Sequence, residues 1–147
     1  MAVDRQQIMA AVVARLAACP SIAGAVTRSP ADFDRKASAQ SPVALVLSGD
    51  EKAERAHRHP PIWTLTPAIH VYARTKTSGV SPDEQLDQVE KEVEAAFERQ
   101  PTEATADQWQ TSLGGLVERC WVTATTRAQG LEEAEVRIEL EILVRGF

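Results

Sequence analysis

Apolar and polar side chains alternate along nearly all of residues 134–147, at the C-terminal end of the chain. The apolar set occupies every second position and comprises Ala134, Val136, Ile138, Leu140, Ile142 and Val144. The positions between them are mostly charged, and only Leu143 departs from the alternation. A period of two residues is typical of a β-strand that is buried on one face and solvated on the other. The pattern predicts a terminal strand about twice as long as the usual ~5–6 residues.

The N-terminal segment shows the spacing of an amphipathic helix. Asp4 and Gln7 are three residues apart, which allows the reciprocal hydrogen bonds of a capping box. Apolar residues then recur at intervals of three and four, led by Ile8, Val12 and Leu16. We therefore expect a helix over residues 5–18.

A second helix is predicted near the middle of the chain. Ser81 is a favourable N-cap, Pro82 suits the first helical position and Glu84 completes a capping box. The apolar stripe that follows consists of Leu86, Val89, Val93, Ala96 and Phe97. This pattern predicts a helix over residues 82–99 whose stripe lies in the core.

Shorter apolar segments predict the remaining strands. They are a short strand near residues 25–28 within a connector at 21–42, a buried strand at 43–47, a strand at 62–74 and a strand at 116–126. Pro67 cannot donate to a strand ladder and therefore predicts a bulge or an edge position. A turn at residues 127–133 would join the last two strands into a hairpin. The element order predicts an α/β fold of the α+β type. Its mainly antiparallel sheet is packed by two amphipathic helices in a single domain, residues 1–147.

Residues 48–61 contain no large apolar side chain, so we expect a charged loop that joins two strands outside the core. Mixed charges can select a partner protein by complementary potential. We interpret six of the charged residues as a candidate contact with another subunit or a partner: Asp50, Glu51, Lys52, Glu54, Arg55 and Arg58. A merely solvated hairpin tip is the alternative interpretation, because charged loops are common on protein surfaces.

The composition narrows the possible partners. With 147 residues, of which 44% are hydrophobic, the chain can bury one substantial core. A net charge of −5 argues against sequence-specific binding of free DNA, which needs a cationic surface. We expect no membrane partner and a cytoplasmic location, because no apolar run or signal-peptide pattern is present. Cys19 and Cys120 are too few for a disulfide scaffold and are expected to be buried, although a spatial pairing stays open.

The histidines give little support to a metal site or an enzyme. His57 and His59 could lie on one side of an extended segment. A zinc site needs three or four protein ligands, and no third ligand accompanies this pair. His70 falls in a strand pattern and is better explained as a hydrogen-bonded residue of the sheet than as a base.

Other candidate motifs also have structural explanations. The glycine pair at residues 114–115 belongs to no phosphate-binding motif and suits a backbone turn. Ser48 and Ser112 lack a nucleophile elbow or a nearby base. We expect the tryptophans to pack mainly in the core and the helix carboxylates to be solvated; these residues are Trp63, Trp109, Trp121, Glu90, Glu92, Glu94 and Glu98. We therefore expect no catalysis, no cofactor and no metal.

Three segments together carry a resemblance to a known family. They are the opening helix DRQQIMAAVVARLAACP, the capped helix SPDEQLDQVEKEVEAAF, and TSLGGLVERCWVTATT leading to the final strand EAEVRIELEILVRGF. In this order, nearly the whole chain resembles the tail-terminator family of long-tailed bacteriophages, also called minor tail protein U or tail-completion proteins. No functional residue is carried over from that family, because the charged loop shares no motif with it.

The resemblance implies a structural virion protein that is found in the tail and, during assembly, in the host cytoplasm. Such proteins form rings, commonly hexamers, at the head-proximal end of the tail tube. They stop tube growth and present the surface that joins the tail to the head. The implied partners are further copies of the chain, the tail-tube protein and a head–tail connector protein, and DNA would pass through the ring lumen. The alternatives are a head-completion or neck connector protein and a small-molecule-binding enzyme with a pocket near His70, Tyr72 or the paired histidines.

Overall fold

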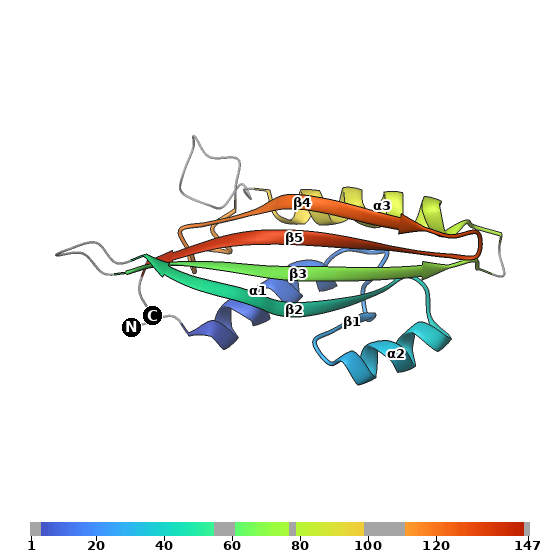
Figure 1. Ribbon diagram of the computed structural model, residues 1–147, viewed down its shortest axis with the longest axis horizontal. Coiled ribbons are helices and arrows are strands. Elements are labelled where there is room, and N and C mark those ends of the chain that lie inside the picture. The colour runs from blue at the N-terminus through green and yellow to red at the C-terminus, as the bar shows by residue number, and fades with distance from the viewer. Residues whose placement is uncertain (1–3, 55–60, 77–78, 99–110, 146–147) are drawn as a thin grey trace.

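The computed structural model describes residues 4–54, 61–76, 79–98 and 111–145. These residues form one five-stranded sheet and three helices (Figure 1). In chain order the elements are α1 (Arg5–Ala17), β1 (Val26–Thr27), α2 (Pro30–Ala39), β2 (Val43–Glu54), β3 (Ile62–Arg74), α3 (Pro82–Ala96), β4 (Arg119–Gln129) and β5 (Glu133–Arg145). The predicted α+β class with a mainly antiparallel sheet is confirmed.

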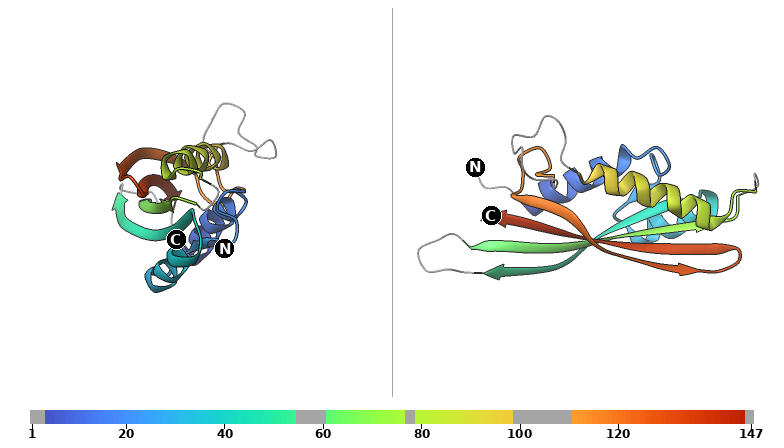
Figure 2. Two further views of the ribbon diagram at one scale, coloured as in Figure 1. Left: turned by 90° about the vertical axis from the view of Figure 1, so that its right-hand side faces the viewer. Right: turned by 90° about the horizontal axis from the view of Figure 1, so that it is seen from above.

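The sheet is built from two long hairpins. Its strand order is β1-β2-β3-β5-β4, with β1 parallel to β2 and every other pair antiparallel. The C-terminal strand β5 therefore lies between β3 and β4, inside the sheet. The hairpins twist strongly along their length (Figure 2, right). The predicted terminal strand is confirmed, and its central position explains why its apolar face is so regular.

The core lies between the sheet and two of the helices. Helices α1 and α3 cover the same face of the sheet (Figure 2, right). The apolar stripe of β5 and the stripes of both helices share one buried cluster with Leu65, Ile69 and Val71 of β3. On α3 and at its C-cap Phe97, the predicted core residues Leu86, Val89, Val93 and Phe97 are at most 2% exposed.

Both predicted helix starts are confirmed. The Asp4 side chain accepts from the Gln7 N–H at 2.9 Å, and Gln7 Oε1 accepts from the Asp4 N–H at 3.0 Å. At α3, Ser81 Oγ accepts from the Glu84 N–H at 3.2 Å, with proline at the first position. Helix α3 ends at Ala96, and the predicted end at residue 99 lies outside the described residues.

Helix α2 corrects the prediction of a connector at residues 21–42. The predicted short strand is present as β1, but residues 30–39 are helical. Ser29 caps α2, accepting from the Asp32 N–H at 3.3 Å, and Pro30 is at the first position. None of the residues of α2 is buried, so the segment has no apolar stripe to reveal it. The helix lies beside β1 and β2 at one edge of the sheet (Figure 1).

Strand β2 continues past Leu47 to Glu54, which corrects the prediction of a loop that starts at residue 48. A bulge between Leu47 and Asp50 divides the strand into a buried and an exposed half. At the bulge, Gly49 has φ +67, and a Cβ there would lie 1.9 Å from the Thr66 carbonyl oxygen. Pro67 lies opposite this irregularity, as its missing donor predicts.

Strand β4 also differs from its predicted limits. It begins at Arg119 rather than at residue 116 and continues to Gln129, through part of the predicted turn. The Gly130 N–H donates to the Glu133 carbonyl oxygen at 2.8 Å, which leaves Leu131 and Glu132 as a two-residue turn. Arg127 is therefore a strand residue, and its side chain contacts α3.

Candidate protein-interaction surface

The exposed half of β2 separates the predicted contact residues into two groups. Asp50, Lys52 and Glu54 pair with Thr66, Thr64 and Ile62 of β3, so their side chains share the sheet face opposite α1 and α3. All three are exposed. Glu51 lies between them in sequence and therefore points to the other face. The remaining predicted contacts, Arg55 and Arg58, lie outside the described residues.

Glu51 is bonded within the chain, and its assignment as a partner contact stays a prediction. Its carboxylate accepts from Arg5 Nε of α1 at 2.7 and 2.8 Å. The Arg5 guanidinium also lies 5.0 Å from the centroid of the Trp63 ring. These contacts join the start of α1 to the hairpin, so Glu51 has a role in the fold.

The face that carries Asp50, Lys52 and Glu54 is covered by neither α1 nor α3 (Figure 2, right). Beside its charged residues it carries the apolar Leu47 and Ile62, each 37% exposed. We call it the open face. The charged side chains of β5 lie on it, opposite the buried stripe: Glu135, Arg137, Glu139, Glu141 and Arg145. Three ion pairs on this side are Lys52–Glu54 at 3.9 Å, Arg137–Glu139 at 3.3 Å and Arg145–Glu118 at 3.2 Å. Exposed pairs of this kind add little to stability and can exchange partners on binding.

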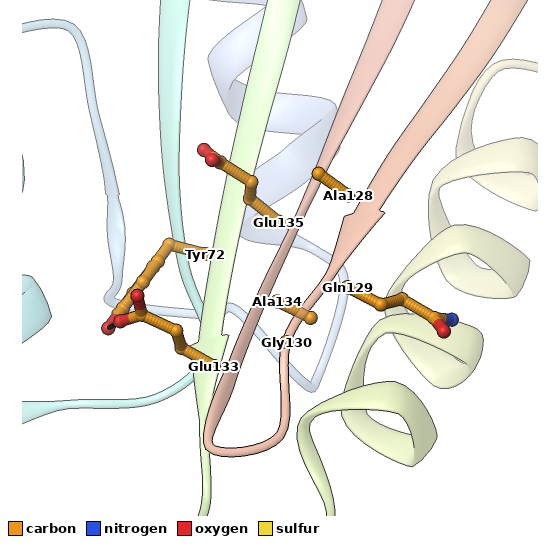
Figure 3. A pocket seen from close by; sticks show the side chains of 7 residues that line it. All are labelled: Tyr72, Ala128, Gln129, Gly130, Glu133, Ala134 and Glu135. Atoms are coloured by element: carbon orange, nitrogen blue, oxygen red, sulfur yellow. Dashed lines mark hydrogen bonds between the residues drawn. The ribbon is translucent and has the colours of Figure 1, made fainter.

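A shallow pocket lies near the β4–β5 turn (Figure 3). It bears on the alternative that the chain is a small-molecule-binding enzyme. Its volume is about 200 Å³, and its lining includes Tyr72, Gly130, Glu133 and Glu135. Tyr72 Oη donates to Glu133 Oε2 at 2.6 Å, and this hydrogen bond raises the pKa of Tyr72 above its ordinary value. A protonated phenol bonded to a carboxylate is poorly prepared to act as a base or a nucleophile.

His70 lies on the same face, two residues before Tyr72. Burial, followed by the neighbouring charge of Arg137, lowers the pKa of His70 below its ordinary value. Its cross-strand neighbours are Leu45 and Arg137. Neither Leu45 nor Arg137 can form a nucleophile–base pair with His70. The geometry therefore favours the explanation of His70 as a structural residue of the sheet.

The cysteines are both free and buried, and they are not paired. Burial raises the pKa of Cys19 to about 11 and that of Cys120 to about 12, so neither is a reactive thiolate at neutral pH. No group of three or more metal-ligating side chains occurs among residues 4–54, 61–76, 79–98 and 111–145. His57 and His59 lie outside these ranges. The glycines at 114 and 115 have φ +73 and +89, which confirms a backbone turn at this pair.

The tryptophans divide between the core and the open face. Trp63 is half-buried and packs against the core cluster. Trp121 is half-buried opposite Glu141, with the Arg119 guanidinium 6.0 Å from its ring centroid. It therefore belongs to the open face, and the expectation that it packs in the core is wrong. Trp109 lies outside the described residues.

Glu90 is not simply solvated, because it helps to bind Arg127 of β4. Arg127 lies 2.7 Å from Glu90, 2.6 Å from Asp83 and 2.9 Å from Asp87, all on α3. The Arg127 side chain is only 19% exposed, so these pairs are better shielded than those of the open face. They fasten the edge strand to the helix. The sequence could not indicate them, since strand and helix are far apart in the chain.

Glu92 is likewise bonded within the fold. Its carboxylate accepts from the Ser21 N–H at 2.8 Å, from the Ser21 hydroxyl, and from Gln88 Nε2 at 2.9 Å. Partial burial raises the pKa of Glu92, but these hydrogen bonds outweigh it, so the pKa lies below its ordinary value. Glu92 thus ties α3 to the segment after α1, whereas Glu94 and Glu98 are exposed as expected.

We expect Glu92→Gln to lower the free energy of unfolding by about 1 kcal/mol at pH 7, through loss of a charged acceptor. A carboxyl whose folded-state pKa is depressed stabilises the fold above its ordinary pKa, and that contribution is lost as the pH falls through the folded value. The difference between wild type and variant should therefore shrink near pH 3. Urea unfolding at both pH values measures it, with Glu94→Gln as the exposed control. An equal effect of the two substitutions at pH 7 would show that the Ser21 bonds contribute nothing.

None of the described helices is both long and apolar enough to cross a membrane. Comparison of the chain with protein-family models and with curated proteins found no match.

Proposed function

We propose that this chain is a structural subunit of a phage tail, which forms a ring at the head-proximal end of the tail tube, stops tube growth and provides the surface that joins the tail to the head. The resemblance to the tail-terminator family, in element order and in the three quoted segments, is the reason for proposing a role in the phage tail. The structural observation that carries the proposal is the exposed half of β2. It extends the sheet past the start of α1 (Figure 2, right). By its pairing with β3 it carries three charged side chains on one face.

The three charged side chains on the open face of this strand contribute little to the monomer's own stability. Asp50, Lys52 and Glu54 are exposed, and the single ion pair among them, at 3.9 Å, is largely solvated. An exposed strand edge can pair with other chains and cause aggregation unless something prevents it. Assembly with a defined partner accounts for a long, charged strand in this position.

Inactivating the gene in a phage that encodes the chain tests the function directly. We expect tails longer than normal that are not joined to heads, because nothing would stop the tube. Electron microscopy of the lysate measures tail length, and restoring the wild-type gene in trans is the control. Tails of normal length that fail to join heads would instead identify a head-completion or neck connector protein. Normal infectious particles would remove the chain from tail assembly.

A further inference from the structure

Apart from the two-residue strand β1, two strands of the sheet have an edge that lacks a neighbour among the described residues. On one side, β4 is the last strand, and Thr111 bridges it only at Cys120. On the other side, β1 pairs with β2 only at Ala44 and Leu45, so the outer edge of the exposed half of β2 has no partner strand. Long unpaired edges are sites of strand addition.

We infer that the free edge of β4 in one copy pairs, antiparallel, with the exposed half of β2 in the next copy. The inference rests on the proposed ring, since a head-to-tail contact is the kind that closes into one. It names the surface through which the copies meet. Continued around a closed ring, this pairing would give the β4 edge and the exposed half of β2 a partner strand in every copy.

Strand direction fits this contact. Successive pairs β2–β3, β3–β5 and β5–β4 are all antiparallel, so β4 runs opposite to β2. When the sheet of one copy continues into the next without turning over, β4 meets β2 in the antiparallel sense. The joint then has the same geometry as the pairs within each copy.

The outward-pointing N–H and C=O groups of the two edges also match. Gly130 bonds inward to Glu133, and the alternation of an antiparallel ladder then turns the N–H and C=O groups of Thr125, Arg127 and Gln129 outward. On β2, the Ala44 N–H points outward to Ala25. The extra residue at the bulge shifts the alternation of inward and outward backbone groups by one residue. Beyond the bulge, the N–H and C=O groups of Glu51 and Ala53 therefore point outward.

The two outward sets have side chains on the same face of the sheet. Thr125 and Arg127 pair with Ile138 and Val136 of the buried stripe, and Glu51 pairs with Leu65. Residues that pair across two strands of a sheet have their side chains on the same face. The two edges can therefore join with α1 and α3 of both copies on the same side.

Charge on the open face limits the register. Ala124, Thr126 and Ala128 are small, and their β5 neighbours are Glu139, Arg137 and Glu135 respectively. Lys52 of the next copy is attracted when it lies opposite Ala124 or Ala128 and repelled by Arg137 when it lies opposite Thr126. The inferred contact therefore places Lys52 opposite one of the two alanines.

Disulfide trapping tests the contact. We expect Lys52→Cys combined with Ala124→Cys or with Ala128→Cys to give covalent oligomers under mild oxidation, in at least fivefold greater yield than with Thr126→Cys. All four positions are exposed, so these variants should fold, which circular dichroism can verify. The single variants and the wild type, whose two cysteines are buried, are the controls.

The mass of the protein in solution distinguishes failure of the edge contact from failure of the proposed ring. Oligomers that give no disulfide at any of the three pairs, or a disulfide from a β4 cysteine alone, would overturn the edge contact and leave the ring in place. A chain that stays monomeric at high concentration would overturn the edge contact together with the proposed ring. Oligomers trapped at one alanine pair would support both.

Discussion

Val93→Asp is expected to abolish folding. Val93 is 0% exposed on the inner face of α3, in the same cluster as Leu86, Val89 and Phe97. A carboxylate at this position would be buried without a partner, which costs several kcal/mol. A domain of this size has only about 5–15 kcal/mol of stability in total. We expect insoluble protein, or soluble protein without a cooperative thermal transition by circular dichroism.

Ala95→Asp is the matched control for this variant. It introduces the same carboxylate on the same helix, two positions further along, where the residue is exposed. Its cost should be about 1 kcal/mol, from helix propensity and a negative charge near the helix C-terminus. Similar losses from the two variants would mean that the buried face of α3 is assigned wrongly.

The elements that the sequence predicts well are those with a buried face. Helices α1 and α3 and strand β5 each bury one stripe of side chains, and burial imposes the period of 3.6 or 2 residues on the sequence. The capping residues then locate the helix starts, as Asp4 and Ser81 do. Burial on one side and a polar cap are both local signals, so one sequence is enough to detect them.

The elements that escape prediction lack such a face. Helix α2 buries no residue, and only its start at Ser29 and Pro30 repeats the signal seen at Ser81 and Pro82. The exposed half of β2 buries no residue on either face, so its side chains do not alternate between apolar and polar. The bulge at Gly49 also shifts the pairing between its two halves.

The candidate surface was predictable in composition but not in geometry. The charges at residues 50–54 identify a solvated segment, and only the strand pairing shows that Asp50, Lys52 and Glu54 share a face while Glu51 does not. The bonds of Glu51, Glu92 and Arg127 join elements that are distant in sequence. No local pattern encodes such contacts.

Reversing the charges of the exposed β2 strand should separate assembly from folding. In Asp50→Lys/Lys52→Glu/Glu54→Lys, the ion pair between residues 52 and 54 is kept with opposite polarity. All three side chains are exposed, so the free energy of unfolding should change by about 1 kcal/mol or less. In the inferred contact the reversed side chains would lie near like charges of β5 in the neighbouring copy, such as Glu139 or Glu135 for residue 52, and such juxtaposition costs several kcal/mol. Subunit association should therefore weaken by roughly 100-fold or more.

Two measurements on that triple variant test whether this surface functions in tail assembly. Sedimentation or mass photometry should show loss of the oligomer, and complementation of a phage that lacks the gene should give overlong tails that are not joined to heads. Lys91→Glu/Glu94→Lys on the exposed side of α3 is the control, because it reverses two charges on the helix side of the sheet. That control should assemble and complement normally. A triple variant that assembles and complements as well as the wild type would exclude Asp50, Lys52 and Glu54 from the contact. A normal melting curve of the triple variant would show that its fold is intact, so a loss of assembly would be assigned to the surface and not to the monomer.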